Sequence, residues 1–253
     1  MAKRNPADVA FFLVGGRSIG GDLTAFEDKV EAIVEQSETL GDAWTEQSYT
    51  GLRTADLSIE GFYDDRQGGV HDALNTSADV APPICYTLEG STFNADFVGW
   101  AAGARATYER QFALGSLHKI KAEYRTQGPI DYGVQLWYPH VATATGNSTA
   151  GPNDNGAGTT GAAGYLQYNA TAGEANIRII HSSNDGTYTE LFAFAQTVKG
   201  VATGSFGSER LTTTGEVKRY TAISITTASA TGTGTTAGLN FFVGLARNLS
   251  SGG

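Results

Sequence analysis

Short runs in which apolar and polar residues alternate recur along the chain and predict β-strands. Leu57 and Ile59 alternate with Ser58 and Glu60, which is the period of a half-buried strand. Further strands are predicted at 11–14, 84–89, 108–112, 117–124, 133–137, 165–168, 177–181, 188–195, 217–226 and 239–245. The Asp185-Gly186 pair suits the positive φ of a hairpin turn after the strand at 177–181.

Two segments are candidates for a helix. Residues 26–40 fit a helical face through Phe26 and Val30, but they also alternate like a strand, and no helix cap follows, which favours the strand. The best helix candidate is 68–74, where Val70, Ala73 and Leu74 share one face.

The stretch 144–164 interrupts the alternation. It holds no large apolar residue and is punctuated by six glycines. Such a composition predicts a linker or a long exposed loop. We therefore expect a first β domain at 1–143, a linker at 144–164 and a second small β-sandwich at 165–253.

Composition agrees with an all-β fold. Only 17% of residues are charged, whereas 33 are glycine and 40% are hydrophobic, which excludes a disordered polyanion. The expected fold is an all-β sandwich with a short flanking helix, followed by a second sandwich. Cys85, the one cysteine, excludes an intrachain disulfide and is predicted to lie buried in a strand. The apolar run 9–14 is too short for a signal peptide or a membrane span.

Negative charge is concentrated in one segment. The net charge of the chain is −9, and residues 22–72 hold thirteen acidic and three basic residues, so the remainder is nearly neutral. One interpretation is a solvated face that aids solubility. The other is a surface past which DNA slides without adhering, because a field of one sign repels phosphates.

No motif in the chain is a strong candidate for catalysis or for binding a metal or a phosphate. The four histidines have no partner at metal-ligand spacing, the turn 153–156 lacks the closing glutamate of a calcium loop, and the glycines at 15–21 lack the Lys-Ser/Thr of a phosphate loop. The pair Asp64 and Asp65 lies in a crowded acidic stretch, which is unsuited to a glycosidase acid and base. We expect no enzyme activity, no catalytic residue, no metal and no cofactor.

Several short motifs follow one another in a particular order and spacing, namely the runs 12–21, 38–44, 49–52 and 57–65 and the segments 70–74, 108–115 and 133–136. In this order and spacing the chain resembles the tail tube (major tail) proteins of long-tailed, siphophage-type bacteriophages. The resemblance covers about residues 11–136, and the part after the Gly-rich stretch is similar to the C-terminal parts of the same kind of virion protein.

This resemblance implies a structural virion protein, made in the host cytoplasm, that assembles with itself into stacked, hexameric rings. Such a tube conducts genome DNA and meets other tail proteins, namely tape measure, terminator and distal tail proteins. It implies no membrane contact and a second domain on the exterior. The candidate lumen-facing acids are Glu27, Glu31, Glu35, Asp56 and Glu60. The loop 35–51 is the candidate ring-to-ring contact, with Glu38, Asp42, Trp44 and Tyr49.

Two other functions remain open at the level of sequence. A capsid decoration protein or a host-surface adhesin would bind glycans through exposed aromatics, although those of the second domain mostly alternate as core residues do. The hypothesis of a hydrolase that uses the acidic cluster has the least support in the sequence.

Overall fold

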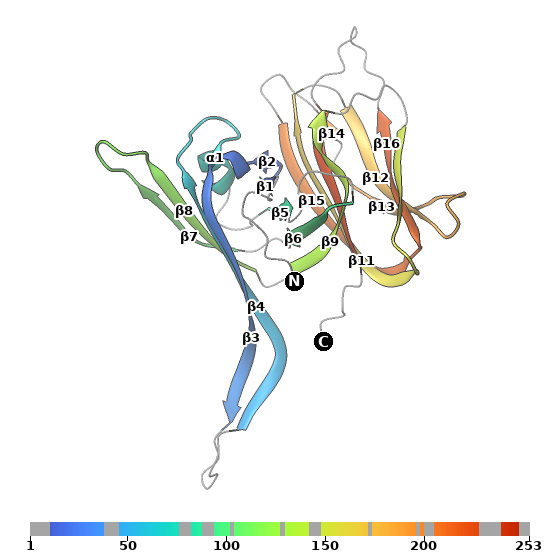
Figure 1. Cartoon of the computed structure of the whole chain (residues 1–253), viewed down its shortest axis with the longest axis horizontal. Coiled ribbons are helices and arrows are strands. Elements are labelled where there is room, and N and C mark those ends of the chain that lie inside the picture. Colours follow the sequence, from blue (N-terminus) through green and yellow to red (C-terminus); the bar gives the residue numbers. More distant parts are fainter. Residues whose placement is uncertain are drawn as a thin grey trace.

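The computed structural model describes residues 11–37, 46–75, 82–87, 94–101, 104–126, 130–141, 148–171, 174–195, 198–199, 205–227 and 239–247. The described residues form antiparallel strands in three sheets, with one short α-helix, α1 (Val70–Asn75), and a 3-10 turn, η2 (Gly20–Asp22) (Figure 1). The predicted all-β fold with a short flanking helix is confirmed.

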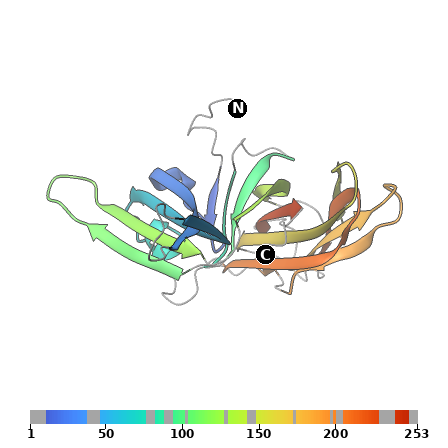
Figure 2. The same ribbon diagram turned by 90° about the horizontal axis from the view of Figure 1, so that it is seen from below.

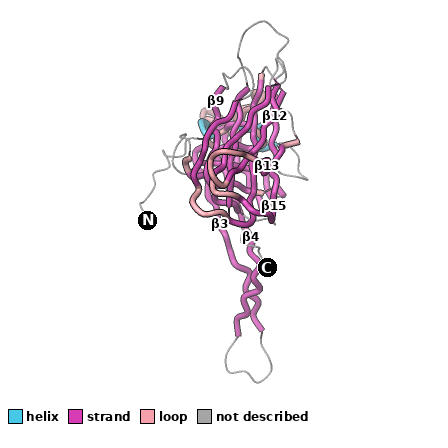
Figure 3. Tube along the Cα trace, turned by 90° about the vertical axis from the view of Figure 1, so that its right-hand side faces the viewer, coloured by secondary structure: helices cyan, strands magenta, loops and turns pink. Residues whose placement is uncertain are grey.

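A four-stranded sheet comes entirely from the first half of the chain. Its order is β3 (Leu23–Ser37), β4 (Glu46–Phe62), β8 (Lys119–Thr126) and β7 (Ala104–Gln111). The ambiguous segment 26–40 is therefore a strand as far as Ser37. Apolar residues such as Leu57 and Ile59 fall on the buried face and the charged residues between them on the other, because side chains alternate along a strand. β3 and β4 form a long hairpin that projects beyond the body of the molecule (Figure 3).

An eight-stranded sheet joins both halves of the chain. Its order is β15 (Ser205–Val217), β11 (Thr159–Ala170), β17 (Leu239–Arg247), β9 (Ile130–Val141), β6 (Asp96–Trp100), β5 (Ile84–Thr87), β1 (Phe12–Val14) and β2 (Arg17–Ser18). The sheet curls until its ends meet. The Gly16 amide donates to Gln167 Oε1 at 2.9 Å, and the Arg17 guanidinium lies 4.7 Å from the Phe206 ring centroid.

Both residues of the turn Gly15–Gly16 must be glycine for the two ends of the curled sheet to meet. Both residues have positive φ, 59° and 84°, and a Cβ on Gly16 would lie 2.1 Å from the Tyr168 carbonyl oxygen. The run 15–21 therefore serves a tight hairpin turn between β1 and β2.

A five-stranded sheet covers the other flank. It has the order β10 (Ser148–Asp154), β16 (Tyr220–Thr227), β12 (Glu174–Ser182) and β13 (Thr189–Ala193), and β14 (Val198–Lys199) also pairs with β12. The predicted hairpin after β12 is confirmed, and Asp185 has a φ of 58°. The segment 217–226, predicted as one strand, is divided: β15 ends at Val217, β16 begins at Tyr220, and the chain crosses between sheets at the two residues between them.

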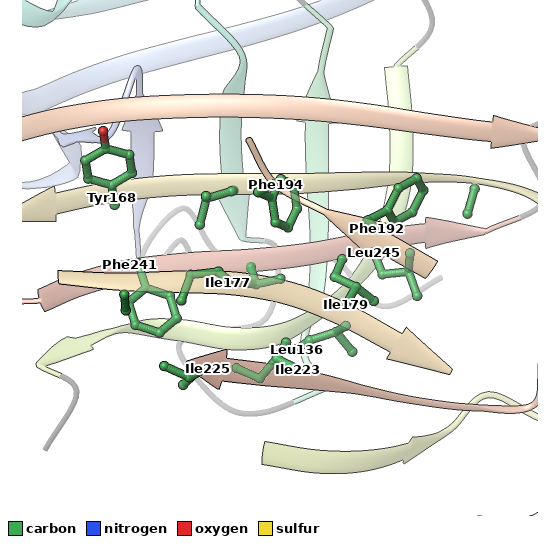
Figure 4. Packing of buried hydrophobic residues seen from close by; sticks show 14 of the residues in the cluster. Leu136, Tyr168, Ile177, Ile179, Phe192, Phe194, Ile223, Ile225, Phe241 and Leu245 are labelled. Atoms are coloured by element: carbon green, nitrogen blue, oxygen red, sulfur yellow. The ribbon is translucent and has the colours of Figure 1, made fainter. Parts of the chain in front are cut away.

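The curled sheet is buried on both faces. One core fills the space between it and the four-stranded sheet, around Trp100, Tyr86 and Leu57, and includes all three predicted helix residues, Val70, Ala73 and Leu74. A second core lies against the five-stranded sheet, around the residues shown in Figure 4. The third lies inside the curl and contains Phe97, Tyr165, Phe242 and Cys85, which is buried as predicted. Figure 2 shows the two smaller sheets on opposite sides of the centre.

The predicted linker at 144–164 needs correction. Residues 148–154 form β10, and residues 159–164 begin β11, which lies between β15 and β17. Small residues suit this place because both faces of β11 are covered: a Cβ on Gly164 would lie 2.8 Å from the Phe192 ring. The eight-stranded sheet runs across the expected boundary between 1–143 and 165–253, so among the described residues the two sandwiches share one sheet.

Candidate assembly surface

The outer face of the four-stranded sheet gathers four of the five predicted lumen acids. Asp56 and Glu60 alternate on β4 with the buried Ala55, Leu57 and Ile59. On β3, Glu27 pairs with Ser58 and Glu31 with Thr54, which places both acids on the same face as Asp56 and Glu60. Glu35 lies further along β3, and its side chain is outside the described residues.

Basic residues are interleaved with these acids, mostly from β8. Lys121 lies 3.7 Å from Glu60 and 3.2 Å from Glu123, and Arg125 Nε lies 3.1 Å from Asp56. On β3, Lys29 pairs with Glu31, whose carboxylate raises the pKa of Lys29. Exposed pairs of this kind contribute little to stability, because water and salt screen the charges. The field of one sign inferred from the segment 22–72 is therefore moderated, because β8 brings cations from a distant part of the sequence.

The two outer strands of this sheet have free edges. Among the described residues β3 pairs only with β4, and β7 pairs only with β8. Every pairing in the sheet is antiparallel, so β3 and β7 run in opposite directions. The pairing of β3 with β4 has no bulge over residues 25–32 of β3, and the pairing of β7 with β8 has none over residues 107–111 of β7. Unpaired backbone donors and acceptors on such edges are templates for another strand.

The predicted ring-to-ring loop 35–51 is mostly strand. Residues 35–37 end β3 and residues 46–51 begin β4. Tyr49 is a β4 residue whose side chain is outside the described residues, and Glu38, Asp42 and Trp44 lie wholly outside them. The expectation of a loop is wrong for the strand residues, because the alternating pattern of the hairpin continues nearly to its tip.

The β7–β8 hairpin carries exposed apolar residues at its tip. Phe112 is 55% exposed, Leu117 70%, and Leu114 is fully exposed, next to Gly115 with its φ of 79°. The order of the strands puts this tip at the opposite end of the sheet from the β3–β4 tip (Figure 1). Three exposed apolar side chains are therefore gathered on this tip.

Helix α1 supports β7 from the buried side. Arg105 donates to the Leu74 carbonyl at 2.7 Å, His71 contacts the Tyr108 hydroxyl, and Arg17 Nε lies 2.7 Å from Asp72 at the start of the helix. These contacts connect the free edge at β7 through α1 to the curled sheet.

The residues considered above for catalysis and for calcium binding form local ion pairs and hydrogen bonds. Arg66 forms an ion pair with Asp64 and lowers the pKa of its carboxyl, so Asp64 is not paired with Asp65 as an acid and base would be. In the turn 153–156, Asp154 pairs with Arg219, and Asn155 donates to Thr221 Oγ1 at 2.7 Å. No cluster of three potential metal ligands occurs among the described residues. In the same part of the chain no helix has the length and apolarity needed to cross a bilayer.

The aromatics of the second half are mostly core residues. Tyr165, Phe241 and Phe242 are almost fully buried and offer no flat platform to a sugar ring. The alternation predicted the burial of Phe241, whereas Phe242 lies on the opposite face of β17 and is buried inside the curl. A hollow of about 280 Å³ beside the Gly15–Gly16 turn is lined by Phe241 and Phe242 and by Gln167, Asn169 and Asn240.

Sequence reasoning missed a buried ionic cluster inside the curl. Asp131 on β9, whose side chain is 1% exposed, accepts from Arg210 Nη2 at 2.7 Å and from the Tyr165 hydroxyl. Burial raises the pKa of Tyr165 well above its usual value, and the charge of Asp131 adds to the rise. The available signal was an acid within an otherwise alternating strand, but the partners lie 34 and 79 residues away.

Comparison with known proteins gives distant structural likenesses. No family model and no curated protein matches. The chain is similar to a protein in the virion of the native gene transfer agent particle (14% identity, TM-score 0.38, covering 51% of this chain and 98% of that one). It is also similar to the Dit (gp 19.1) protein of phage SPP1, described as a hub adsorption apparatus (10% identity, TM-score 0.33, 94% and 98%). A third likeness is to a chain of infectious bursal disease virus strain Gx (12% identity, TM-score 0.33, 97% and 58%). Since TM-scores below 0.5 do not establish a shared fold, these likenesses carry no argument about function.

Proposed function

We propose that this chain is a structural virion protein, a tail tube subunit that assembles with copies of itself into stacked rings. The observation that carries the proposal is the four-stranded sheet, whose free edges β3 and β7 run in opposite directions. When copies are related by rotation about an axis, β7 of one copy meets β3 of the next in antiparallel orientation, which continues the ladder. The resemblance of residues 11–136 to tail tube proteins points the same way.

The proposed ring has six copies, which gives a barrel of twenty-four strands. Strands about 4.8 Å apart and tilted by about 36° enclose a barrel about 45 Å across between backbones. The polar outer face of the sheet lines this lumen, with Glu27, Glu31, Glu35, Asp56 and Glu60 as its acids. Because cations from β8 partly balance these acids, DNA meets short-range charges of both signs rather than a uniform field.

Rings stack through the two tips of the sheet. The β7–β8 tip, with Phe112, Leu114 and Leu117, lies at one end of the sheet, and the β3–β4 hairpin lies at the other. In a stack, each ring therefore presents one kind of tip to the other kind on the next ring. The five-stranded sheet, built from β10, β12, β13, β14 and β16, lies away from the lumen, on the exterior, and the ends of the tube meet the tape measure, terminator and distal tail proteins.

Electron microscopy of the purified chain tests the proposal. We expect rings or tubes with six-fold symmetry, roughly 100 Å wide for subunits of this size. A chain carrying Leu114→Ser and Leu117→Ser should form rings that no longer stack, because the exposed apolar contact is lost. A protein that stays monomeric at high concentration, and only binds glycans, would contradict the proposal.

A further inference from the structure

The free edges of the four-stranded sheet carry charges that specify how two copies align. On the outer face, β7 has Thr107, Glu109 and Gln111, and β3 has Glu27, Lys29 and Glu31. On the inner face, β7 has Tyr108 and Arg110, and β3 has Asp28 and Val30. All of these residues except Tyr108 are exposed, and Val30 is an apolar side chain left 46% exposed at the edge.

We infer that the partner of β7 is β3 of a second copy, in the one register that sets Glu109 opposite Lys29. This inference rests on the proposed ring and names its lateral contact. We call this arrangement the Lys29 register. In antiparallel pairing it also sets Arg110 opposite Asp28 on the inner face, and Tyr108 opposite the exposed Val30. Two opposite-charge pairs and one aromatic–β-branched pair then face each other, the combinations that stabilise neighbouring strands.

The neighbouring registers pair the two strands less favourably. A slip by one residue turns outer side chains against inner ones, so only slips by two residues keep both faces matched. A slip of two residues in one direction sets Glu109 opposite Glu27, and in the other direction it sets Glu109 opposite Glu31. Like charges directly opposite each other destabilise strand pairing. The carboxylates that flank Lys29 therefore exclude both slips.

The geometry of a closed barrel independently disfavours one of the two slips, the one that faces Glu109 with Glu27. A line perpendicular to the strands runs from Ala25 on β3 through Glu60 and Lys121 to Glu109 on β7. In the Lys29 register this line arrives at Lys29 on β3 of the next copy, four residues beyond its starting point at Ala25. Since the line crosses four strands, the offset is one residue per strand. With a rise of about 3.3 Å and a strand spacing of about 4.8 Å, this offset tilts the strands by about 35°, at the lower end of the usual range for barrels. The slip that faces Glu109 with Glu27 halves the offset and gives only about 19°.

Paired cysteines test the register. The variant Glu109→Cys/Lys29→Cys should form disulfides between copies on mild oxidation of assembled protein, giving a ladder of covalent oligomers on non-reducing gels. The matched controls are Glu109→Cys/Glu27→Cys and Glu109→Cys/Glu31→Cys, in which the partner is displaced by about 7 Å and lies beyond disulfide reach. The native Cys85 is fully buried and does not interfere. We expect at least tenfold more cross-linking from the first variant.

A charge reversal gives a second measurement. Glu109→Lys should reduce ring formation at least tenfold, and the added change Lys29→Glu should restore it. If wild-type protein forms rings but a displaced control cross-links as well as the Lys29 pair, the register is wrong and the tube function stands. If wild-type protein forms no rings under any condition, both the function and the register fail.

Discussion

At the scale of the residue, the clearest feature is the cluster of Asp131, Tyr165 and Arg210. It lies inside the curled sheet and joins β9 from the first half of the chain to β11 and β15 from the second. A buried carboxylate is tolerated only when charge and hydrogen bonds compensate it. The cluster therefore makes the packing of the two halves specific.

Removing the cation of this cluster should destabilise the protein strongly. Arg210→Met leaves the Asp131 carboxylate buried without its ion pair, and we expect a loss of about 3–5 kcal/mol in the free energy of unfolding. Urea unfolding followed by tryptophan fluorescence measures the loss. Arg125→Met is the matched control, since its pair with Asp56 is exposed and should change stability by less than about 1 kcal/mol. Equal losses for the two variants would show that the buried pair is not special.

At the scale of the element, the strand β11 shows how context decides structure. Its first half contains only Thr, Gly and Ala, which alone predict a loop. The same small residues allow close approach: Gly164 fits beneath Phe192, and Ala162 and Ala163 are fully buried on opposite faces. In contrast, β4, β8, β12 and α1 were predictable, because each has one buried and one exposed face and so carries a clear periodicity.

Hydrogen exchange tests the placement of β11. Because β15 and β17 flank it on both sides, its backbone amides at 162–168 should be among the slowest to exchange in the protein. Amides of the exposed turn at Ala157 and Gly158 should exchange many orders of magnitude faster and serve as the internal control. Fast exchange throughout 159–168 would mean that this segment is a linker after all.

The turn after β10 has a measurable electrostatic signature. The Arg219 guanidinium beside Asp154 lowers the pKa of its carboxyl to about 2, with help from the Gly156 amide. A carboxyl with a lowered pKa stabilises the fold above its unfolded pKa of about 3.9, and this contribution disappears as the pH falls towards 2. Arg219→Met should raise the pKa of Asp154 towards its ordinary value, as followed by NMR titration of the carboxyl carbon. An unchanged pKa would mean that the pair does not form in solution.

At the scale of the whole molecule, two sandwiches share one curled sheet. The core against the five-stranded sheet takes Leu136 from β9, while Phe97 from β6 packs on Tyr165 and Phe242 inside the curl. Each half therefore completes the core of the other.

Separating the halves should abolish cooperative folding. A fragment of residues 1–143 lacks β11, β15 and β17, so Phe97, Leu136 and Trp137 lose their cover, and we expect aggregation or a broad, non-cooperative thermal transition. The full chain should unfold in one transition that coincides by fluorescence and circular dichroism. A fragment that unfolds as sharply as the full chain would show that the first sandwich is an independent domain.

The all-β class, the positions of most amphipathic strands, the short helix and the buried cysteine could be predicted from the amino-acid sequence, because each depends on local periodicity or composition. The three-dimensional fold was needed to show that the Gly-rich segment pairs as strands, that cations from β8 lie among the acids of β3 and β4, and that Asp131 is buried against Arg210. Those features depend on contacts between residues far apart in the chain, and no local pattern encodes which distant strands become neighbours.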